Sequence, residues 1–131
     1  MTLPSLPFKE RFTSGRQLLP GHRMNAYADM LTSYTGGIVA TAAGTNLNSV
    51  QITSAFNDVS VVASANDSVL LPVAQIGLQI CITNSDAADS LRVFPVGADT
   101  IKGAANFDMA AGVSTFFVCN KPGVWRTYNA A

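Results

Sequence analysis

Side chains that commonly do acid–base or nucleophilic chemistry are scarce in this chain. There is one histidine, His22, and one glutamate, Glu10, so an acid–base pair would have to come from aspartates. Asp86 and Asp89 stand three residues apart in a turn-rich stretch, where carboxylates more often cap a turn than form a catalytic pair. No serine stands in a Gly-x-Ser-x-Gly elbow, and no glycine pattern matches a phosphate-binding loop. The sequence therefore predicts no catalytic residue, no cofactor and no enzyme activity.

Metal ligands are equally scarce. Cys81 and Cys119 lie far apart in strand-like surroundings, and with a single histidine they fall short of the ligand number of a structural zinc site. No Asp-x-Asp-x-Asp-Gly calcium loop is present. We therefore expect no metal site. Both cysteines are expected to be buried free thiols rather than a disulfide. A protein made in the cytoplasm rarely forms disulfides, and a domain of this size can be stable without one.

The composition favours a protein that assembles with others. The 131 residues suffice for one compact domain, and 48% hydrophobic residues can supply its core. Only 12% of the residues are charged, about half the usual share. A surface with so few charges has little electrostatic repulsion to prevent self-association. We therefore expect much of the surface to be covered by a partner or by copies of the same chain, in a dimer or trimer.

Two other partner classes are not expected. Eight basic residues balance eight acidic ones, so there is no strong positive field to hold nucleic acid. No apolar run reaches the length of a membrane span, and the N-terminal residues lack the apolar stretch of a signal peptide. The sequence thus predicts neither a nucleic-acid partner nor a membrane partner.

Residues 1–23 differ from the rest of the chain. Prolines at positions 4, 7 and 20 exclude a helix or a central strand, which predicts an extended arm. The arm has four basic residues against one acidic residue, a net charge of +3, whereas residues 24–131 have four against seven, a net charge of −3. An unordered tail is the alternative, although such tails are usually poor in large apolar residues. The arm residues expected to contact a partner are Phe8, Lys9, Arg11, Phe12, Arg16, Leu18 and Leu19.

Residues 22–34 carry the one helical pattern in the chain. Apolar side chains recur there at helical spacing on one face, and Gly36-Gly37 is a stop signal. We expect a short helix and a linker over residues 24–36, with the apolar stripe packed on the body or on a neighbouring subunit rather than around a ligand. The stripe consists of Met24, Tyr27, Leu31 and Tyr34.

Residues 37–131 show an all-β pattern without a visible internal repeat. Short runs rich in Val, Ile, Phe and Thr alternate with turn clusters. Such strands predict a jelly-roll-like two-sheet β-sandwich, with Phe117 and Trp125 as core anchors and with Leu78, Ile80 and Ile82 on one face. The predicted strands are Ile38–Thr41, Val50–Ser54, Asp58–Ala63, Ser68–Pro72, Gly77–Thr83, Ser90–Phe94, Thr100–Ile101, Ser114–Cys119 and Val124–Tyr128.

One longer pattern covers residues 69–126. A predicted strand ends in Leu71-Pro72, and a second, buried strand ends at Asn84. After it come Val93-Phe94-Pro95 and a Gly-x-Asp-x-Ile-x-Gly motif at 97–103. An aromatic strand then precedes Trp125. This pattern resembles a β module of tailed-bacteriophage virion proteins, which occurs in capsid decoration (cement) proteins and in fibre or spike proteins. The resemblance implies a structural role on the virion, and the short chain with its arm is more similar to a cement protein.

The expected function follows from the arm and the resemblance together. We expect a protein, made in the cytoplasm of the bacterial host, that binds the outer surface of the phage capsid and cements neighbouring major capsid protein subunits. An extended arm reaches far for few residues and can pair with an exposed sheet edge. The expected location is therefore the capsid surface of the virion.

Two alternatives lead to other tests. A head-fibre or tail-associated module would bind a receptor or glycan, with Phe56-Asn57-Asp58 and Asn106-Phe107-Asp108 as candidate loops. We expect both loop phenylalanines to pack beneath their loops instead. A metal-dependent enzyme on a cupin-like jelly roll would need several His and Glu ligands, and the chain has one of each.

Overall fold

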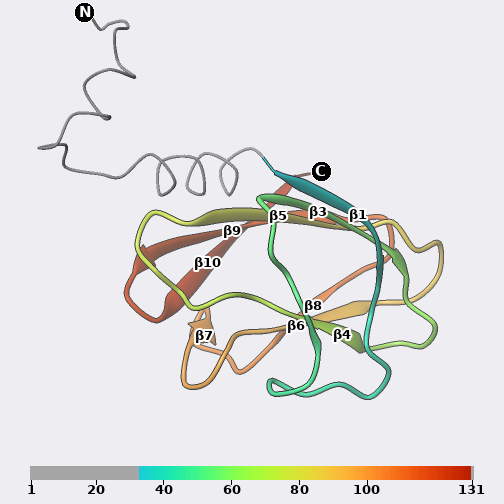
Figure 1. Cartoon of the computed structure of the whole chain (residues 1–131), viewed down its shortest axis with the longest axis horizontal. Coiled ribbons are helices and arrows are strands. Elements are labelled where there is room, and N and C mark those ends of the chain that lie inside the picture. Colours follow the sequence, from blue (N-terminus) through green and yellow to red (C-terminus); the bar gives the residue numbers. More distant parts are fainter. Residues whose placement is uncertain (1–32, 131) are drawn as a thin grey trace, which may run out of the picture.

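The computed structural model of the chain describes residues 33–130. All regular structure in this part is β, as the sequence predicts for residues 37–131, and it is divided between two sheets (Figure 1). The six-stranded sheet has the order β1-β3-β5-β9-β10-β7, and the four-stranded sheet has the order β2-β4-β6-β8. The strands are β1 (Tyr34–Val39), β2 (Val50–Gln51), β3 (Phe56–Val61), β4 (Asp67–Leu70), β5 (Gln79–Asn84), β6 (Leu91–Phe94), β7 (Thr100–Ile101), β8 (Phe107–Met109), β9 (Ser114–Lys121) and β10 (Val124–Ala130).

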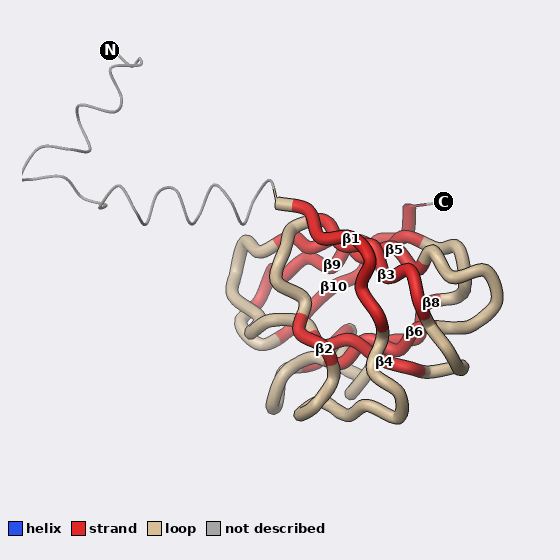
Figure 2. Tube along the Cα trace, turned by 45° about the vertical axis from the view of Figure 1, so that its right-hand side comes forward, coloured by secondary structure: helices blue, strands red, loops and turns tan. Residues whose placement is uncertain are grey.

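The first six strands wind as a short solenoid. Consecutive strands alternate between the two sheets, and each of the first four pairs in parallel with the strand two places further on. In the turned view of Figure 2, β1, β3 and β5 lie in the upper layer and β2 and β4 in the lower layer. Val50 pairs with Val69 one coil later, and Phe56 pairs with Cys81, so that one coil takes between 19 and 25 residues. Antiparallel pairings of β9 with β5 and β10, and of β8 with β6, together with the parallel pairing of β7 with β10, complete the sheets.

The predicted jelly roll is therefore wrong, although its two sheets are confirmed. A jelly roll is built from antiparallel strands in Greek-key order, whereas neighbouring strands of the first coils are parallel. Short alternating strands and turn residues are common to both architectures, because side-chain alternation does not depend on the direction of the neighbouring strand. The coils also differ in length, which hides the repeat from the sequence.

The N-terminal predictions are tested only at their last residues. The arm and the stripe residues Met24, Tyr27 and Leu31 lie outside the described residues. The predicted helix is wrong at Tyr34, which begins β1 and pairs with Phe56. The carbonyl of Ser33 accepts a hydrogen bond of 3.0 Å from the Phe56 N–H. Pairing with an existing strand satisfies the backbone here and overrides the helical spacing.

The strand predictions hold for position but not for pairing. Each of the nine predicted strands overlaps an observed one, and only β8 was not predicted. Between the sheets, Phe117 and Trp125 are fully buried and anchor the core as expected. Ile80 and Ile82 are buried there too, and Leu78 packs against them. Cys81 and Cys119 are confirmed as buried free thiols.

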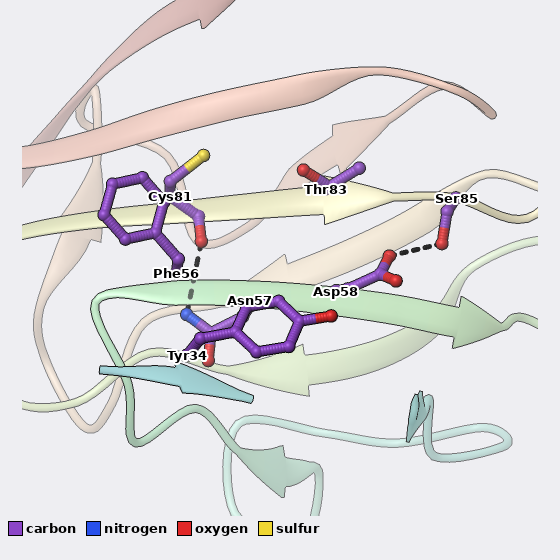
Figure 3. Close-up of a pocket in the computed structure, with 7 residues that line it drawn as sticks. All are labelled: Tyr34, Phe56, Asn57, Asp58, Cys81, Thr83 and Ser85. Atoms are coloured by element: carbon purple, nitrogen blue, oxygen red, sulfur yellow. Dashed lines mark hydrogen bonds between the residues drawn. The ribbon is translucent and has the colours of Figure 1, made fainter. Parts of the chain in front are cut away.

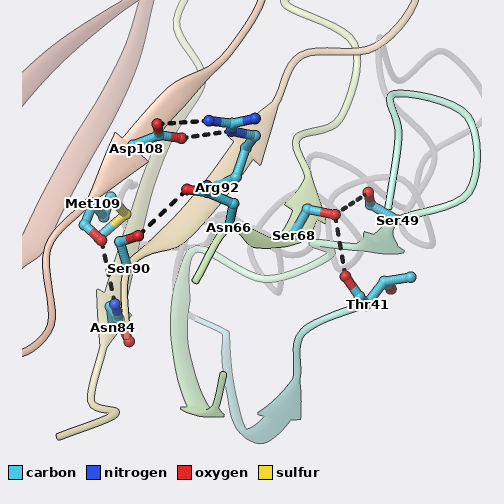
Figure 4. A network of polar contacts seen from close by, with 9 residues as sticks. All are labelled: Thr41, Ser49, Asn66, Ser68, Asn84, Ser90, Arg92, Asp108 and Met109. Carbon is cyan, nitrogen blue, oxygen red and sulfur yellow. Dashed lines mark hydrogen bonds and ion pairs between the residues drawn. The ribbon is translucent and has the colours of Figure 1, made fainter. Parts of the chain in front are cut away.

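Two residues of the 69–126 pattern hold loops in place. The buried side-chain amide of Asn84 donates to the carbonyl of Asp89 at 2.9 Å. It also donates to the carbonyl of Met109 at 3.3 Å, and this second bond is drawn in Figure 4. The Oδ2 atom of Asp99 accepts a 2.9 Å hydrogen bond from the Ala74 N–H. Buried backbone carbonyls and amides need such partners, so these motif positions have structural roles in this chain.

A loop covers part of the four-stranded sheet. The Ser68 side chain is fully buried, and its hydroxyl lies 2.6 Å from the hydroxyl of Ser49 and donates at 3.4 Å to the Thr41 carbonyl (Figure 4). Gly44 lies directly over this pair, because a Cβ there would overlap both serine oxygens. The close approach of the loop thus requires glycine at this position.

Candidate binding face on the six-stranded sheet

One row of side chains crosses five strands of the six-stranded sheet. Each member is the direct cross-strand partner of the next, so they form a line perpendicular to the strands. We call these residues the aromatic row. In order across β1, β3, β5, β9 and β10 they are Tyr34, Phe56, Cys81, Phe116 and Tyr128.

Side-chain alternation directs the row away from the core. In β3, β5 and β9 the residues next in sequence to row members are buried inside: Asn57, Ile80 and Phe117. Successive side chains of a strand point to opposite faces, so the row lies on the outer face. Tyr34 is 66% exposed, Tyr128 59% and Phe56 47%. An exposed line of large aromatic side chains is uncommon on a monomer and marks a surface for contact.

The row is packed along its middle. Phe56 and Phe116 meet edge to face, with ring centroids 6.4 Å apart and an interplanar angle of 87°. Cys81 lies between them in the register and is only 8% exposed. At the β1 end, a Cβ on Gly36 would overlap the Tyr34 hydroxyl, so glycine leaves room for that ring to lie along its strand. The inner part of the row is therefore held in place while its two ends are open.

Two hollows flank the row beside Phe56 and Cys81. The larger one, of about 550 Å³, extends to Asp58, Thr83 and Ser85 (Figure 3). The smaller one, of about 210 Å³, lies on the other side and extends to Gln79. Because the cysteine is small, the middle of the row is lower than its aromatic neighbours. The face thus offers two depressions that the side chains of a partner can fill.

Polar groups border the row on both sides. On one side the hydroxyls of Thr83 and Ser114 lie 2.7 Å apart, and Ser85 donates a short hydrogen bond to the Asp58 carboxylate (Figure 3). On the other side the register places the polar side chains of Gln79 and Arg126 on either side of the apolar Val118. A central apolar strip with a polar border is the usual layout of a protein-binding surface.

Asn57 lies beneath the row and joins two strands. Its side-chain amide donates to the carbonyls of Ser54 at 2.8 Å and Cys81 at 3.2 Å, and the second bond is drawn in Figure 3. Its Oδ1 atom is buried without a hydrogen-bond partner in the described part of the chain. Of the candidate loop Phe56-Asn57-Asp58, only Phe56 and Asp58 therefore face outward.

The electrostatics of the face do not favour a nucleophile. Burial raises the pKa of the Cys81 thiol, and a hydrogen bond with Thr83 lowers it by a smaller amount. The thiol is therefore protonated at neutral pH, and a thiol is a weaker nucleophile than a thiolate. Among the residues that the structure describes, no three His, Cys, Asp or Glu side chains are close enough to hold a metal ion. The arrangement is suited to contact and stacking.

The second candidate loop is occupied by internal contacts. Phe107 packs edge to face on Phe117, with centroids 5.8 Å apart, and the Lys102 ammonium lies 5.4 Å from the Phe107 ring centre. Asp108 forms a bidentate pair with Arg92 at 2.7 and 2.8 Å (Figure 4). Internal packing is thus confirmed for Phe107, although it lies on β8 rather than in a loop. The same prediction is wrong for Phe56, which lies on β3 and is about half exposed.

Turn capping by aspartate is confirmed at Asp86. Its carboxylate accepts the N–H groups of Ala88 at 3.0 Å and Asp89 at 2.9 Å. These bonds, with a weaker one from the Val62 N–H, lower the pKa of Asp86. Asp86 and Asp89 are therefore joined through the backbone of one turn, as the sequence predicts for capping groups.

The sequence analysis did not recognise the row as a unit. Tyr34 was assigned to the helical stripe, Cys81 was expected to be a buried free thiol, and Phe116 and Tyr128 were not selected. One usable signal was present: in a strand, adjacent Phe116 and Phe117 must point to opposite faces. One of the two had to lie outside the core, but the register that aligns it with the other members is not written in any single strand.

Comparison with known proteins gives no further assignment. No protein-family model, curated protein or solved structure matches the chain. Within the described range, no helix has the length and apolar character needed to cross a membrane.

Proposed function

We propose that the chain is a structural protein of a tailed-phage virion, which binds the outer surface of the capsid and cements neighbouring major capsid protein subunits. In this proposal, residues 1–23 form the contact with the capsid through their apolar and basic side chains. The β body provides the part that remains on the capsid surface and contacts further copies of the chain. The location is the virion, after synthesis in the host cytoplasm.

The observation that carries this proposal is the exposed aromatic row. Nothing within residues 33–130 covers this apolar face, and a body of about one hundred residues with such a face is poorly suited to exist alone in solution. The low content of charged residues, 12% of the chain, supports the same conclusion. Assembly into a larger structure covers such a surface and makes its burial favourable.

The charge distribution supports the arm as the capsid contact. Residues 1–23 have a net charge of +3, whereas the remainder of the chain has a net charge of −3. A basic segment with interspersed phenylalanine and leucine can anchor on an acidic surface through apolar side chains while its charges steer the encounter. Many weak anchors on one shell then add through multivalency.

Co-sedimentation tests the proposal. The intact chain is mixed with empty, expanded capsids of the phage that encodes it, and bound protein is measured against concentration. We expect saturable binding by the intact chain and none after removal of residues 1–20. Circular dichroism must show that the truncated protein retains its β structure. Binding that is unchanged by the truncation would exclude the arm, and no binding by either protein would exclude the cement function.

A matched pair of variants separates charge from chain length. Lys9→Glu with Arg11→Glu reverses two arm charges, and Lys102→Glu with Lys121→Glu reverses two charges of the body. We expect the first pair to weaken capsid binding and to reduce its dependence on salt. The second pair, which changes the net charge equally, is expected to bind as the parent does.

A second candidate function is the binding of a receptor glycan. It is favoured by the position of Phe56 beside a hollow of about 550 Å³ that Asp58, Thr83 and Ser85 border. An exposed ring can stack on a sugar while neighbouring hydroxyl and carboxylate groups form hydrogen bonds with it. Glycan-array binding that Phe56→Ala abolishes, without capsid binding, would favour this candidate.

A further inference from the structure

We propose that the aromatic row is the surface on which a second copy of this chain docks face to face. This goes beyond the proposed function, because the contact would form in the free protein as well as on a capsid. The argument depends on three properties of the face: its area, its shape and the positions of two opposite charges.

The face is large enough for a dimer. Five strands about 4.8 Å apart, each about six residues long at about 3.3 Å per residue, cover a projected area of roughly 480 Å². Two such faces together bury roughly 1,000 Å², which is where specific protein interfaces begin. Aromatic side chains at the centre of an interface contribute most of its binding energy. We therefore expect a dimer that dissociates on dilution.

The shape of the face is complementary to itself. Phe56 and Phe116 form raised parts of the row, and the two hollows of about 550 and 210 Å³ lie directly beside Phe56 and Cys81. When two faces cross at right angles near the middle of their rows, the side of one face that carries Val118 and Arg126 lies opposite the larger hollow of the other. Packed sheets commonly cross either nearly aligned or nearly at right angles.

Two opposite charges occupy diagonal positions on the face. Asp58 is on β3 on one side of the row, and Arg126 is on β10 on the other side. From strand spacing and rise they are about 14 Å apart along the row and about 13 Å across it, so that they cannot pair within one copy. Arg126 has no ion-pair partner among the described residues.

A two-fold axis satisfies both charges at once. An axis in the plane of the face, at roughly 45° to the row and passing between β5 and β9, exchanges the positions of Asp58 and Arg126. Arg126 of each copy then lies opposite the partner's Asp58, and the sheets cross nearly at right angles. The same axis places Cys81 and Phe116 at the centre of the contact.

A charge exchange between variants tests this arrangement in the full-length chain. Sedimentation velocity over a range of concentrations is expected to show a monomer–dimer equilibrium for the parent. Asp58→Arg and Arg126→Asp are each expected to weaken the dimer at least tenfold in Kd, because each places like charges opposite one another twice. Mixing the two variants restores both ion pairs, so that a heterodimer of near-parental affinity is expected.

The controls change charge or apolar surface elsewhere. Lys121→Asp alters an exposed charge outside the row, and Leu47→Ser removes an apolar side chain that is 84% exposed on the loop over the other sheet. Both are expected to dimerise as the parent does. Far-ultraviolet circular dichroism of each variant checks that the β structure is retained.

Several results would overturn the proposal. A parent that stays monomeric at high concentration would do so, as would an oligomer that Phe56→Ser and Asp58→Arg leave unchanged. Failure of the mixed variants to associate would exclude the two-fold arrangement. If substitutions in the row instead abolish capsid or glycan binding of a monomer, the face belongs to that partner. Because capsid binding is measured separately through the arm, either proposal can fail without the other.

Discussion

The two sheets of this protein have very different outer faces. On the six-stranded sheet, the outward side chains include three large aromatic ones, Tyr34, Phe56 and Tyr128, that are exposed to solvent. On the four-stranded sheet, the outward side chains of β4, Ser68 and Leu70, are buried, and Ser68 lies beneath the loop that carries Gly44. The second face has its partner within the same chain, and the described residues provide none for the first. The burial of an outward side chain is therefore decided by what covers the sheet rather than by its polarity.

The largest effect that separates the two faces is expected at their glycines. Gly44→Ala forces a methyl group into the hydrogen-bonded hydroxyls of Ser68 and Ser49, and overpacking of this kind costs about 2 kcal/mol. Gly36→Ala on the open face meets only the mobile end of the Tyr34 side chain. We expect it to change the free energy of unfolding by less than about 0.5 kcal/mol. Urea unfolding of both variants measures the difference, and equal losses would contradict it.

A smaller difference is expected between two hydroxyl pairs. Ser68→Ala removes a fully buried hydroxyl that contacts Ser49 and the Thr41 carbonyl, at a cost of about 1 kcal/mol. Thr83→Ala removes the contact with Ser114 on the open face, where water can replace it, at a cost of about 0.3 kcal/mol. Thermal unfolding at neutral pH compares the two. A greater loss for Thr83→Ala would show that the open face is covered under the conditions of measurement.

The ion pair between Arg92 and Asp108 is expected to contribute least to the free energy of unfolding. Asp108 and Arg92 are 44% and 30% exposed, and such pairs are worth about 0.5 kcal/mol or less. Asp108→Asn is therefore expected to cause a small loss of stability that disappears in about 1 M salt. Urea midpoints at low and high salt measure it. A loss that persists in high salt would indicate a packing role instead.

Low pH is expected to reduce the stability that the carboxylates of Asp108 and Asp86 contribute. Hydrogen bonds from Arg92 lower the pKa of Asp108, and backbone N–H groups lower the pKa of Asp86. A carboxyl whose pKa is lower in the folded than in the unfolded state stabilises the fold above its unfolded value. This contribution decreases as the pH falls from about 4 through the folded pKa. Urea midpoints measured against pH are expected to fall less steeply for Asp108→Asn and Asp86→Asn.

Much of the local structure could be predicted from the sequence. The alternation of Ile80 and Ile82 with polar neighbours places their strand face in the core, and nine strands and both core anchors are where the patterns indicate. Asp86 caps a turn because a short carboxylate side chain in a loop readily accepts the backbone N–H groups two and three residues further on. These are properties of neighbouring residues, which the order of side chains determines.

The arrangement of the strands could not be predicted in the same way. Strands β1, β3 and β5 would show the same alternation in an antiparallel jelly roll, so that their parallel pairing leaves no local trace. Tyr34 shows how strand pairing overrides a local pattern. Its three-residue spacing from Leu31 fits one face of a helix, but in the fold Tyr34 pairs with Phe56 of the neighbouring strand.

The sequence by itself determined that residues 37–131 have an all-β pattern, that the chain has few groups for acid–base chemistry, and that its net charge is +3 over residues 1–23 and −3 over the remainder. Only the tertiary structure decided that it winds as a solenoid and that Tyr34, Phe56, Cys81, Phe116 and Tyr128 form one line. The physical reason is that composition and alternation act within a few residues. Register joins residues far apart in the sequence, such as Cys81 and Phe116, which are 35 positions apart, through backbone hydrogen bonds that any side chain permits.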